Sequence, residues 1–262
     1  HGYFEQQGDI YNAPSVAPSP MIATGGIISD YTDGSAVYRA HIFTSSGTFN
    51  VTALSSNTTN GDNIDFLAIG GGGSGGEGCG GGGGAGGYRT SMPDAPGGPG
   101  TSAESQVAGA VGNYAVTIGA GGAEGTAGTT SVGNPGGFSN VAFPTAIRSE
   151  GGGGGGFSGG SGSIGENGGS AGGGNYPGRS PQGVANKVAG TNTSAPTQGH
   201  AGGTSATGPQ YANGGGGGAG GAGGNTPDNG TGGAGGAGKA SVISHGPTNP
   251  ITRAGGGGGG VY

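Results

Sequence analysis

The sequence has few of the residues that build a conventional hydrophobic core. It contains no tryptophan, only 6% aromatic residues and 29% hydrophobic residues in all, whereas 78 of its 262 residues are glycine. Ordering a residue costs roughly 1–2 kcal/mol of conformational entropy, and glycine loses more than any other residue. We therefore expect contacts between backbones, rather than between side chains, to supply much of the stabilising free energy.

Charge and cysteine are also scarce. Charged residues make up 8% of the chain, the net charge is −6, and the 7 lysines and arginines are scattered. Nucleic-acid binding needs clustered cations that displace counterions, so we expect no nucleic-acid partner. No apolar run approaches the ~20 residues that cross a bilayer. Cys79, the single cysteine, lies in a glycine run, where it is interpreted as a small apolar filler; an intermolecular disulfide or a metal ligand is the alternative.

Residues that could support catalysis do not form a complete motif. The stretch 233–239 is one residue short of a P-loop, and Ala240 stands where Ser or Thr would hold Mg²⁺. His1 matches the N-terminal histidine of copper monooxygenases, but the other three histidines have no supporting context. The carboxylates are scattered singly, so nothing indicates an acid–base pair. We expect no catalytic residues, no cofactor and no metal site.

Short β-branched and aromatic stretches predict a small β-sandwich-like module. Residues 36–43 and 48–54 alternate or are rich in strand formers, the turn signal "TSSG" lies between them, and 63–70 follows. The module is expected to span 36–69 and to be completed by 113–119, 137–143 and 261–262. Residues 1–35 are rich in proline and predict an extended N-terminal arm or connector. No helix pattern is present, so almost no α-helix is expected.

The glycine runs between 70 and 262 carry side chains at intervals of three. Three residues per turn, with no internal hydrogen bonds, is typical of the polyproline-II class of helix. Bare glycine edges would allow such helices to pack closely and to bond to one another through their backbones. We therefore predict a slab of packed polyglycine-II helices, in which decorated edges lie outside and undecorated runs lie inside. The period appears at Ser74 and Glu77, at Ala219 and Ala222, at Ala234 and Ala237, and in phase at Ser158, Ser161, Ile164, Asn167 and Ser170; the predicted lattice core is Gly151, Gly153, Gly155, Gly255, Gly257 and Gly259.

Counting the directions of the runs predicts which loops lie at the far end of the slab. The strand at 63–69 delivers the chain into the first run, which must travel away from the β-module. If 157–174 continues outward, the loops 88–112, 175–212 and 239–254 are distal and 261–262 return to the β-module. Tyrosine and arginine are common interface anchors, so these loops supply candidate partner contacts. The bland interpretation, which the composition favours over partner contact, is that the tyrosines cap the ends of the slab and exclude water from the terminal glycines. The candidate contact residues are Tyr88, Arg89, Met92, Tyr176, Arg179, Tyr211, His245 and Arg253.

Several phrases of the sequence resemble a known family. "HIFTSSGTFNVTAL", "DFLAIGGGGSGG", "GGGGAGGYRTS", "YAVTIGAGG" and "ITRAGGGGGG" are similar to the glycine-rich domain of predicted structural proteins of marine phages, from about Tyr38 to the C-terminus. The expected architecture also resembles, in style, the tip adhesin of T-even-like long tail fibres, where polyglycine-II helices present variable loops to a bacterial receptor. This chain departs from that adhesin because a β-module precedes the slab.

The resemblance implies a non-enzymatic phage structural protein on the virion surface. It would be a fibre, a tail-tip protein or a capsid-surface appendage. Its N-terminal arm would contact other virion proteins, its distal loops would contact a host-surface protein or glycan, and it could form a homo-oligomer. A bacterial extracellular filament or matrix protein that self-assembles through the same packing is the alternative.

Overall fold

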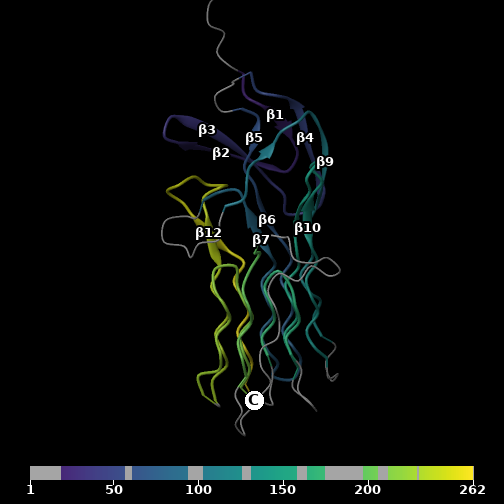
Figure 1. The fold of residues 1–262 in the computed structure, drawn as a ribbon, viewed down its shortest axis with the longest axis vertical. Helices are drawn as coiled ribbons and strands as arrows, with labels where there is room; N and C mark the ends of the chain where they lie inside the picture. Colours follow the sequence, from purple (N-terminus) through teal and green to yellow (C-terminus); the bar gives the residue numbers. More distant parts are fainter. Residues whose placement is uncertain are drawn as a thin grey trace, which may run out of the picture.

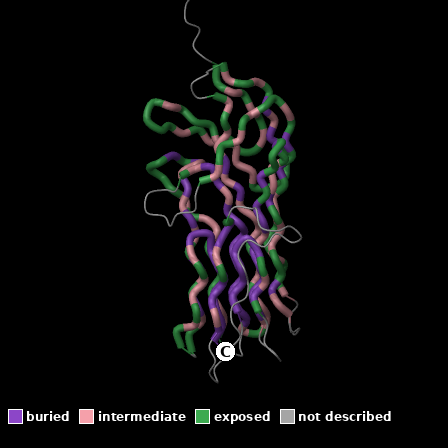
Figure 2. Tube along the Cα trace, in the orientation of Figure 1, coloured by how far each residue is buried: buried purple, intermediate pink, exposed green. Residues whose placement is uncertain are grey.

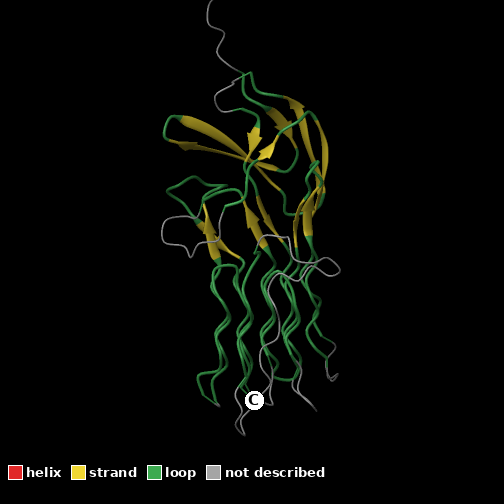
Figure 3. Ribbon diagram, in the orientation of Figure 1, coloured by secondary structure: helices red, strands yellow, loops and turns green. Residues whose placement is uncertain are grey.

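The computed structural model describes residues 19–56, 61–93, 103–125, 131–157, 164–174, 197–205, 212–228 and 230–261. The molecule is elongated, with strands toward one end and glycine-rich segments running side by side to the other (Figures 1 and 3). No helix occurs in this part of the chain, so the prediction of a mainly β and irregular fold is confirmed. Likewise, none of the described residues forms a helix long and apolar enough to cross a membrane. The strands are β1 (Ile22–Thr24), β2 (Ile27–Asp33), β3 (Ala36–Ile42), β4 (Gly47–Ala53), β5 (Asn63–Ile64), β6 (Leu67–Ile69), β7 (Tyr88–Thr90), β8 (Val107–Ala108), β9 (Gly112–Thr117), β10 (Ser139–Val141), β11 (Ile147–Ser149), β12 (Lys239–Ser241) and β13 (Ile251–Arg253).

A five-stranded antiparallel sheet in the order β1-β4-β9-β10-β11 holds the hydrophobic core. Alternation in β4 buries Phe49 and Val51, and alternation in β9 buries Tyr114 and Val116 on the same face. Phe66 and Ala68 pack against this face, as do partly buried residues of the β5–β8 pair. The core therefore lies between the large sheet and the two-stranded pairs.

The N-terminal segment differs from the expected arm. Residues within 1–35 form β1, which pairs with β4, and β2, which pairs with β3 over its whole length. The β2–β3 hairpin closes through a two-residue turn at Gly34 and Ser35, where Gly34 has φ 60°. Gly-Ser between strand-forming stretches is a hairpin signal, and glycine with a positive φ at the first loop position is typical of a type II′ turn. Residues 1–18 of the predicted arm lie outside the described residues.

The glycine slab consists of extended segments that run between the two ends of the molecule. Their backbone hydrogen bonds repeat every third residue: the N–H groups of Gly70, Gly73 and Gly76 donate to the carbonyls of Gly87, Gly84 and Gly81. The next residues in register, Gly71, Ser74 and Glu77, donate instead to a second neighbour, 131–137. Because three residues per turn is the period of the polyproline-II class, we interpret the segments as polyglycine-II helices. The slab comprises the described residues 70–87, 119–125, 131–137, 150–157, 164–174, 197–205, 212–226, 231–238 and 254–261.

Glycine is sterically required in the interior of the slab. A Cβ atom on any of Gly151, Gly153 or Gly155 would lie well under 3.0 Å from a backbone carbonyl oxygen of a neighbouring segment. The buried residues form a continuous band through the middle segments (Figure 2). Each net hydrogen bond contributes about 0.5–1.5 kcal/mol, so a lattice of regularly spaced bonds offsets much of the ordering entropy of glycine.

The run 255–260 differs from the expected lattice core. Gly255, Gly257 and Gly258 are exposed, and a Cβ on Gly255 would meet nothing closer than 3.7 Å. Only Gly259 of the predicted core residues in this run has a Cβ position well under 3.0 Å from another backbone. The run is the last segment added to the slab, and no further segment of the described chain covers its outer side.

The described residues of the decorated edges are exposed or half-buried, with two exceptions, Ala219 and Ser170. Ala222, Ala234 and Ala237 are exposed, as expected for one edge of a three-residue period. Ala219, in contrast, is only 2% exposed. The chain reverses around 219–221, and the Ala219 N–H donates to the carbonyl of Ala254, so this side chain faces the inside of a turn.

The directions in which the glycine runs travel differ from those predicted from the sequence. The first run is two antiparallel segments, 70–76 and 80–87, joined by a turn in which Gly78 and Cys79 have φ values of 60° and 61°. This extra reversal brings Tyr88 back to the sheet, where β7 pairs with β6. A second reversal, at 219–221 within the expected single run 213–224, sends the last run outward, so that Val261 bridges Ala212 in the slab instead of joining the sheet. Tyr262 lies outside the described residues.

Candidate recognition surface

The chain reverses repeatedly at the end of the slab remote from the five-stranded sheet, which we call the tip (Figure 1). The turn 77–79 lies there, because Gly80 accepts from Gly260 and Gly81 accepts from Gly76. The turn at Asp228 and Thr231, which form an isolated bridge, lies at the same end. The tip is thus built from several separate segments of the chain. Its described residues are Glu77, Gly78, Cys79, Gly125, Ser131, Asn213, Asp228, Thr231 and Val261.

Asn213 holds three tip segments together. Its side chain is fully buried, and its amide Nδ2 donates to the carbonyls of Cys79 and, over 3.3 Å, of Gly260. Its backbone N–H also donates to Gly260, over 3.1 Å. Cys79 is therefore a turn residue with a left-handed backbone, held by a neighbouring segment, and not the filler expected from the sequence. Such a fixed turn can present the residues around it in one geometry.

Charge is distributed unevenly between the two ends. The described cationic side chains all belong to strands on the sheet side: Arg39, Arg89, Arg148, Lys239 and Arg253. Glu77 and Asp228 lie at the tip, and no lysine or arginine accompanies them among the described tip residues. The backbone N–H of Gly230, with a further contribution from the Thr231 hydroxyl, lowers the pKa of Asp228 below its ordinary value of 3.8. This carboxyl is thus ionised at neutral pH, so the described part of the tip is acidic.

Two of the predicted contact residues are used at the junction between the sheet and the slab. Tyr88 is 4% exposed, and the Lys239 ammonium lies 5.5 Å from the centre of its ring. Arg89 forms a bidentate ion pair with Glu104 and donates to the carbonyl of Arg148 over 3.1 Å. Neither residue is available to a partner. Met92, just after β7, is half-buried next to them.

Further polar groups fill the same junction. The Gln198 side-chain oxygen accepts from the N–H of Glu150 over 2.8 Å, and its carbonyl accepts from the N–H of Tyr88 over 2.8 Å. The Glu150 carboxylate pairs with Arg148, whose pKa is raised by that hydrogen bond. Arg148 also lies over the ring of Phe138, 3.8 Å from its centre. These contacts join strands to glycine segments, which is a structural task.

The remaining predicted contacts are divided between the β12–β13 loop and the undescribed part of the chain. Arg253 donates to the Ser244 hydroxyl over 3.2 Å, and that hydroxyl lies 2.6 Å from Nδ1 of His245. Ser244 in turn accepts through its carbonyl from Ser29 of β2, so this loop is on the sheet side. His245 is exposed. Tyr176, Arg179 and Tyr211 lie outside the described residues, as does most of loop 175–212.

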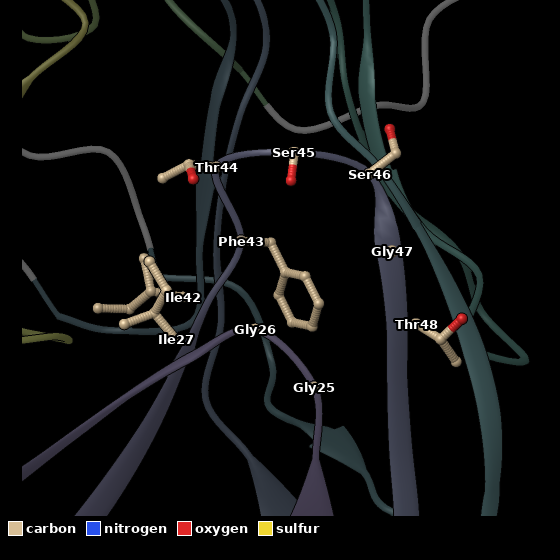
Figure 4. Close-up of a pocket in the computed structure, with 10 residues that line it drawn as sticks. All are labelled: Gly25, Gly26, Ile27, Ile42, Phe43, Thr44, Ser45, Ser46, Gly47 and Thr48. Atoms are coloured by element: carbon tan, nitrogen blue, oxygen red, sulfur yellow. The ribbon is translucent and has the colours of Figure 1, made fainter.

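A recess of about 390 Å³ lies between β1 and the start of β4, around the ring of Phe43 (Figure 4). Glycines form part of its wall, and a Cβ on Gly26 would approach the Phe43 ring to 3.1 Å. Thr44, Ser45, Ser46 and Thr48 add hydroxyl groups. No titratable side chain lines this recess, so it offers hydrogen bonds and an aromatic surface but no acid–base chemistry. Within the described residues, no group of histidine, cysteine and carboxylate side chains could hold a metal ion.

Comparison with known proteins places these features in a family. The model of a family described as "Glycine-rich domain" matches residues 44–262, which covers β4 and everything after it. The chain belongs to the glycine-rich domain family. The hairpin β2–β3 and strand β1 precede the matched part of this glycine-rich domain protein. No curated protein and no solved structure matches the chain significantly.

Of the tip turns that the structure reveals, the one at 77–79 has almost no signal in the sequence. Glu77 and Cys79 interrupt a glycine run without proline or any strand former beside them. The signal that exists is weak: two non-glycine residues two apart break the three-residue phase set by Ser74 and Glu77. In contrast, the turn at 226–231 carries Thr-Pro-Asp-Asn-Gly, an ordinary turn composition.

Proposed function

We propose that this glycine-rich domain protein is a non-enzymatic structural protein that presents its tip for recognition of a host surface. In the most specific form of the proposal, it is a phage fibre, tail-tip protein or capsid-surface appendage. One observation carries the proposal. The sheet and the tip lie at opposite ends of a slab whose segments all run between them (Figure 1).

The slab has the properties of a spacer. Successive segments are joined laterally by backbone hydrogen bonds at every third residue, so none of them can bend independently. The exposed side chains of the turns at its ends lie outside this lattice, and they can change without disturbing it. A lattice of this kind supports variable tip residues on a constant body, which is what recognition of differing surfaces requires.

The proposed contact surface is the tip and not the junction. Tyr88 and Arg89 are not among the proposed contact residues, because both are held in the junction. Residues of the tip are proposed instead. Tyr176, Arg179 and Tyr211 remain proposed contacts. The partner is a host-surface protein or glycan, which polar and aromatic side chains can bind through hydrogen bonds and ring stacking.

The sheet end is the proposed attachment end. It carries the β2–β3 hairpin, in which Val37 is 74% and Ile27 61% exposed. Exposed apolar side chains gathered on one element are typical of protein contacts. On this proposal the sheet end contacts the rest of a virion, and localisation on the virion surface follows.

Binding of the purified, fluorescently labelled protein to candidate host cells tests the proposal. The triple variant Tyr176→Ala, Arg179→Ala, Tyr211→Ala should lower cell binding about tenfold, the loss expected for interface anchors. The matched control Val37→Ser, Tyr38→Ser alters exposed residues at the opposite end and should leave cell binding unchanged. Equal binding by the triple variant, or assembly of the purified protein into homopolymeric filaments, would contradict the proposal and favour a matrix protein.

A further inference from the structure

Segment 80–87 is the centre of the slab and has an incomplete ring of neighbours. Its backbone bonds to five other segments, and consecutive members of that ring also bond to one another. The ring is open between its first and last members, because no hydrogen bond joins 70–76 to 254–261. In order, the neighbours are 70–76, 150–156, 170–174, 212–218 and 254–261.

The opening leaves a row of backbone donors without acceptors. In the central segment, Gly81 and Gly84 donate to 150–156, and Gly82 and Ala85 donate to 212–218. In each three-residue helical turn of this segment, the backbone N–H of the remaining residue donates to no acceptor in the described chain. The residues concerned are Gly80, Gly83 and Gly86.

These unpaired N–H groups are unusual because the residues are buried. Every residue from 80 to 88 is buried, and more than about 90% of buried backbone N–H groups in proteins have a partner. The carbonyls of Gly80 and Gly83 are paired, with Gly260 and Gly257. The unpaired row therefore faces the one direction in which the central segment has no neighbour among the described segments.

The two walls of the opening supply matching acceptors. The carbonyls of Gly70, Gly73 and Gly76 accept no hydrogen bond in the described chain. On the other wall, the carbonyls of Gly255 and Gly258 accept none. A groove with one row of donors on its floor and a row of acceptors on each wall is complementary to a single extended backbone.

The walls also carry glycine where the chain itself has no steric need for it. Gly72 and Gly75 are exposed, and a Cβ on either would meet nothing closer than 3.8 Å and 3.6 Å, in both cases a carbonyl oxygen of the central segment. Exposed positions of other outer segments carry Ala222, Ala234 and Ala237. Bare glycine at the groove keeps it open at an entropic cost.

We propose that this groove, formed by 70–76, 80–86 and 254–260, binds a glycine run from a separate polypeptide in the polyglycine-II conformation. The bound run would complete the hexagonal ring around 80–87 and pair all three rows. An uncharged groove lined by backbone groups selects a backbone and not an ion or a sugar. The inference concerns the side of the slab and is independent of the proposed recognition at the tip.

This chain has no free glycine run to serve as the occupant. Outside the described residues, no segment has more than two consecutive glycines. Within the slab, the glycine runs already bond to their own neighbours, so a second folded copy would have to break those bonds to lend one. A separate chain with a free run of about six glycines meets the requirement, since such a run spans roughly 19 Å at 3.1 Å per residue.

Amide hydrogen exchange tests the groove in the free protein. The amides of Gly80, Gly83 and Gly86 should exchange about tenfold faster than those of Gly81, Gly82 and Gly84, since they lack acceptors. Equal protection of both sets would overturn the proposal, because it would mean that the row is already paired. Protection that rises with protein concentration would show a second copy in the groove and would equally overturn the assignment to a separate chain.

Peptide binding to glycine-¹⁵N-labelled protein tests the occupant. The probe is TRAGGGGGGVY, the sequence of residues 252–262, and its control replaces the six glycines by alanine. The glycine peptide should shift and protect the amides of the floor row, and the alanine peptide should not. Gly75→Leu, which fills the groove but leaves the slab intact, should weaken binding at least about tenfold, whereas Ala237→Leu on another edge should not. Absent binding, or binding unaffected by Gly75→Leu, would overturn the proposal.

Discussion

A Cβ atom on Gly154 would lie well under 3.0 Å from the carbonyl oxygen of Gly133. Gly133 in turn donates its own N–H to Gly155, so the two segments cannot separate to make room without losing hydrogen bonds. Gly154→Ala should therefore cost more than about 4 kcal/mol, a loss seen only for severe overpacking or cavity mutations. Denaturant unfolding monitored by circular dichroism would measure it.

Gly258→Ala is the matched control. Gly258 is exposed, and a Cβ there would meet only the carbonyl oxygen of Gly233, at 3.9 Å. Replacing a glycine by alanine in a compatible conformation restricts the unfolded chain and stabilises by about 0.4–1 kcal/mol. Equal losses for both variants would contradict the distinction between interior and edge segments.

The three-residue period of the slab could be predicted from the sequence, but its direction could not. The period shows in the spacing of Ala234 and Ala237, which are exposed, and it recurs in the hydrogen bonds. A reversal inside a glycine run has no side-chain signature, because glycine adopts a left-handed backbone without penalty. The missed turn at 77–79 exchanged the predicted end of loop 88–112, and the missed turn at 219–221 exchanged those of loop 239–254 and of Val261.

The same limit applies to the segment 158–170, whose side chains keep a phase of three. Ile164 and Asn167 are exposed, but Ser170 is fully buried. The hydrogen bonds explain the difference: Gly169 pairs with Gly151, whereas Ser170 accepts from Gly153, so the chain has turned back. Composition specifies the lattice, while loop constraints at both ends specify which neighbour each segment meets.

The kinds of residue in the candidate site could be predicted from the sequence, but their positions in the fold could not. Tyr88 was expected in an exposed loop. Instead it lies in β7, which pairs with β6, because Leu67 and Thr90 lie at the two open ends of the first antiparallel pair of glycine segments. The β2–β3 hairpin was predictable from Gly34 and Ser35, which separate two strand-forming stretches, whereas the Pro-rich composition before it predicts an extended arm.

Glycine should be more favourable than cysteine at position 79. Its φ of 61° is costly for a residue with a side chain, about 1–3 kcal/mol at a strained position. Cys79→Gly should therefore raise the melting temperature or leave it unchanged, while Cys79→Val should lower it because a β-branched residue tolerates this conformation least. Calorimetry of the three proteins under reducing conditions decides the matter. Stabilisation by valine would contradict the turn geometry.

The turn at Asp228 should loosen in acid. The Gly230 N–H, which donates to Asp228 Oδ1 over 2.8 Å, and then the Thr231 hydroxyl lower the pKa of this carboxyl. A depressed folded-state pKa stabilises the turn fully above the ordinary value of 3.8, and that contribution is lost as the pH falls through the folded-state pKa. The amide shift of Gly230, followed by NMR between pH 6 and pH 2, should report this transition. Asp228→Asn should abolish it, and a midpoint above 3.8 would contradict the assigned hydrogen bonds.

The side chain of Gln198 should contribute more to the free energy of unfolding than the side chain of an exposed glutamine. Gln198 is 2% exposed, and its side-chain oxygen is the acceptor for the buried N–H of Glu150. Gln198→Ala leaves that donor without a partner, which costs about 1–3 kcal/mol. Gln106 is the matched control, because it is exposed and donates to Asp65 over 2.9 Å. Gln106→Ala should change the free energy of unfolding by less than about 0.5 kcal/mol, as surface substitutions usually do. Urea unfolding of both variants measures the difference, and exchange of the Glu150 amide should rise only in Gln198→Ala. If the two variants unfold alike, the junction is held by its ion pairs and glycine contacts and not by this side chain.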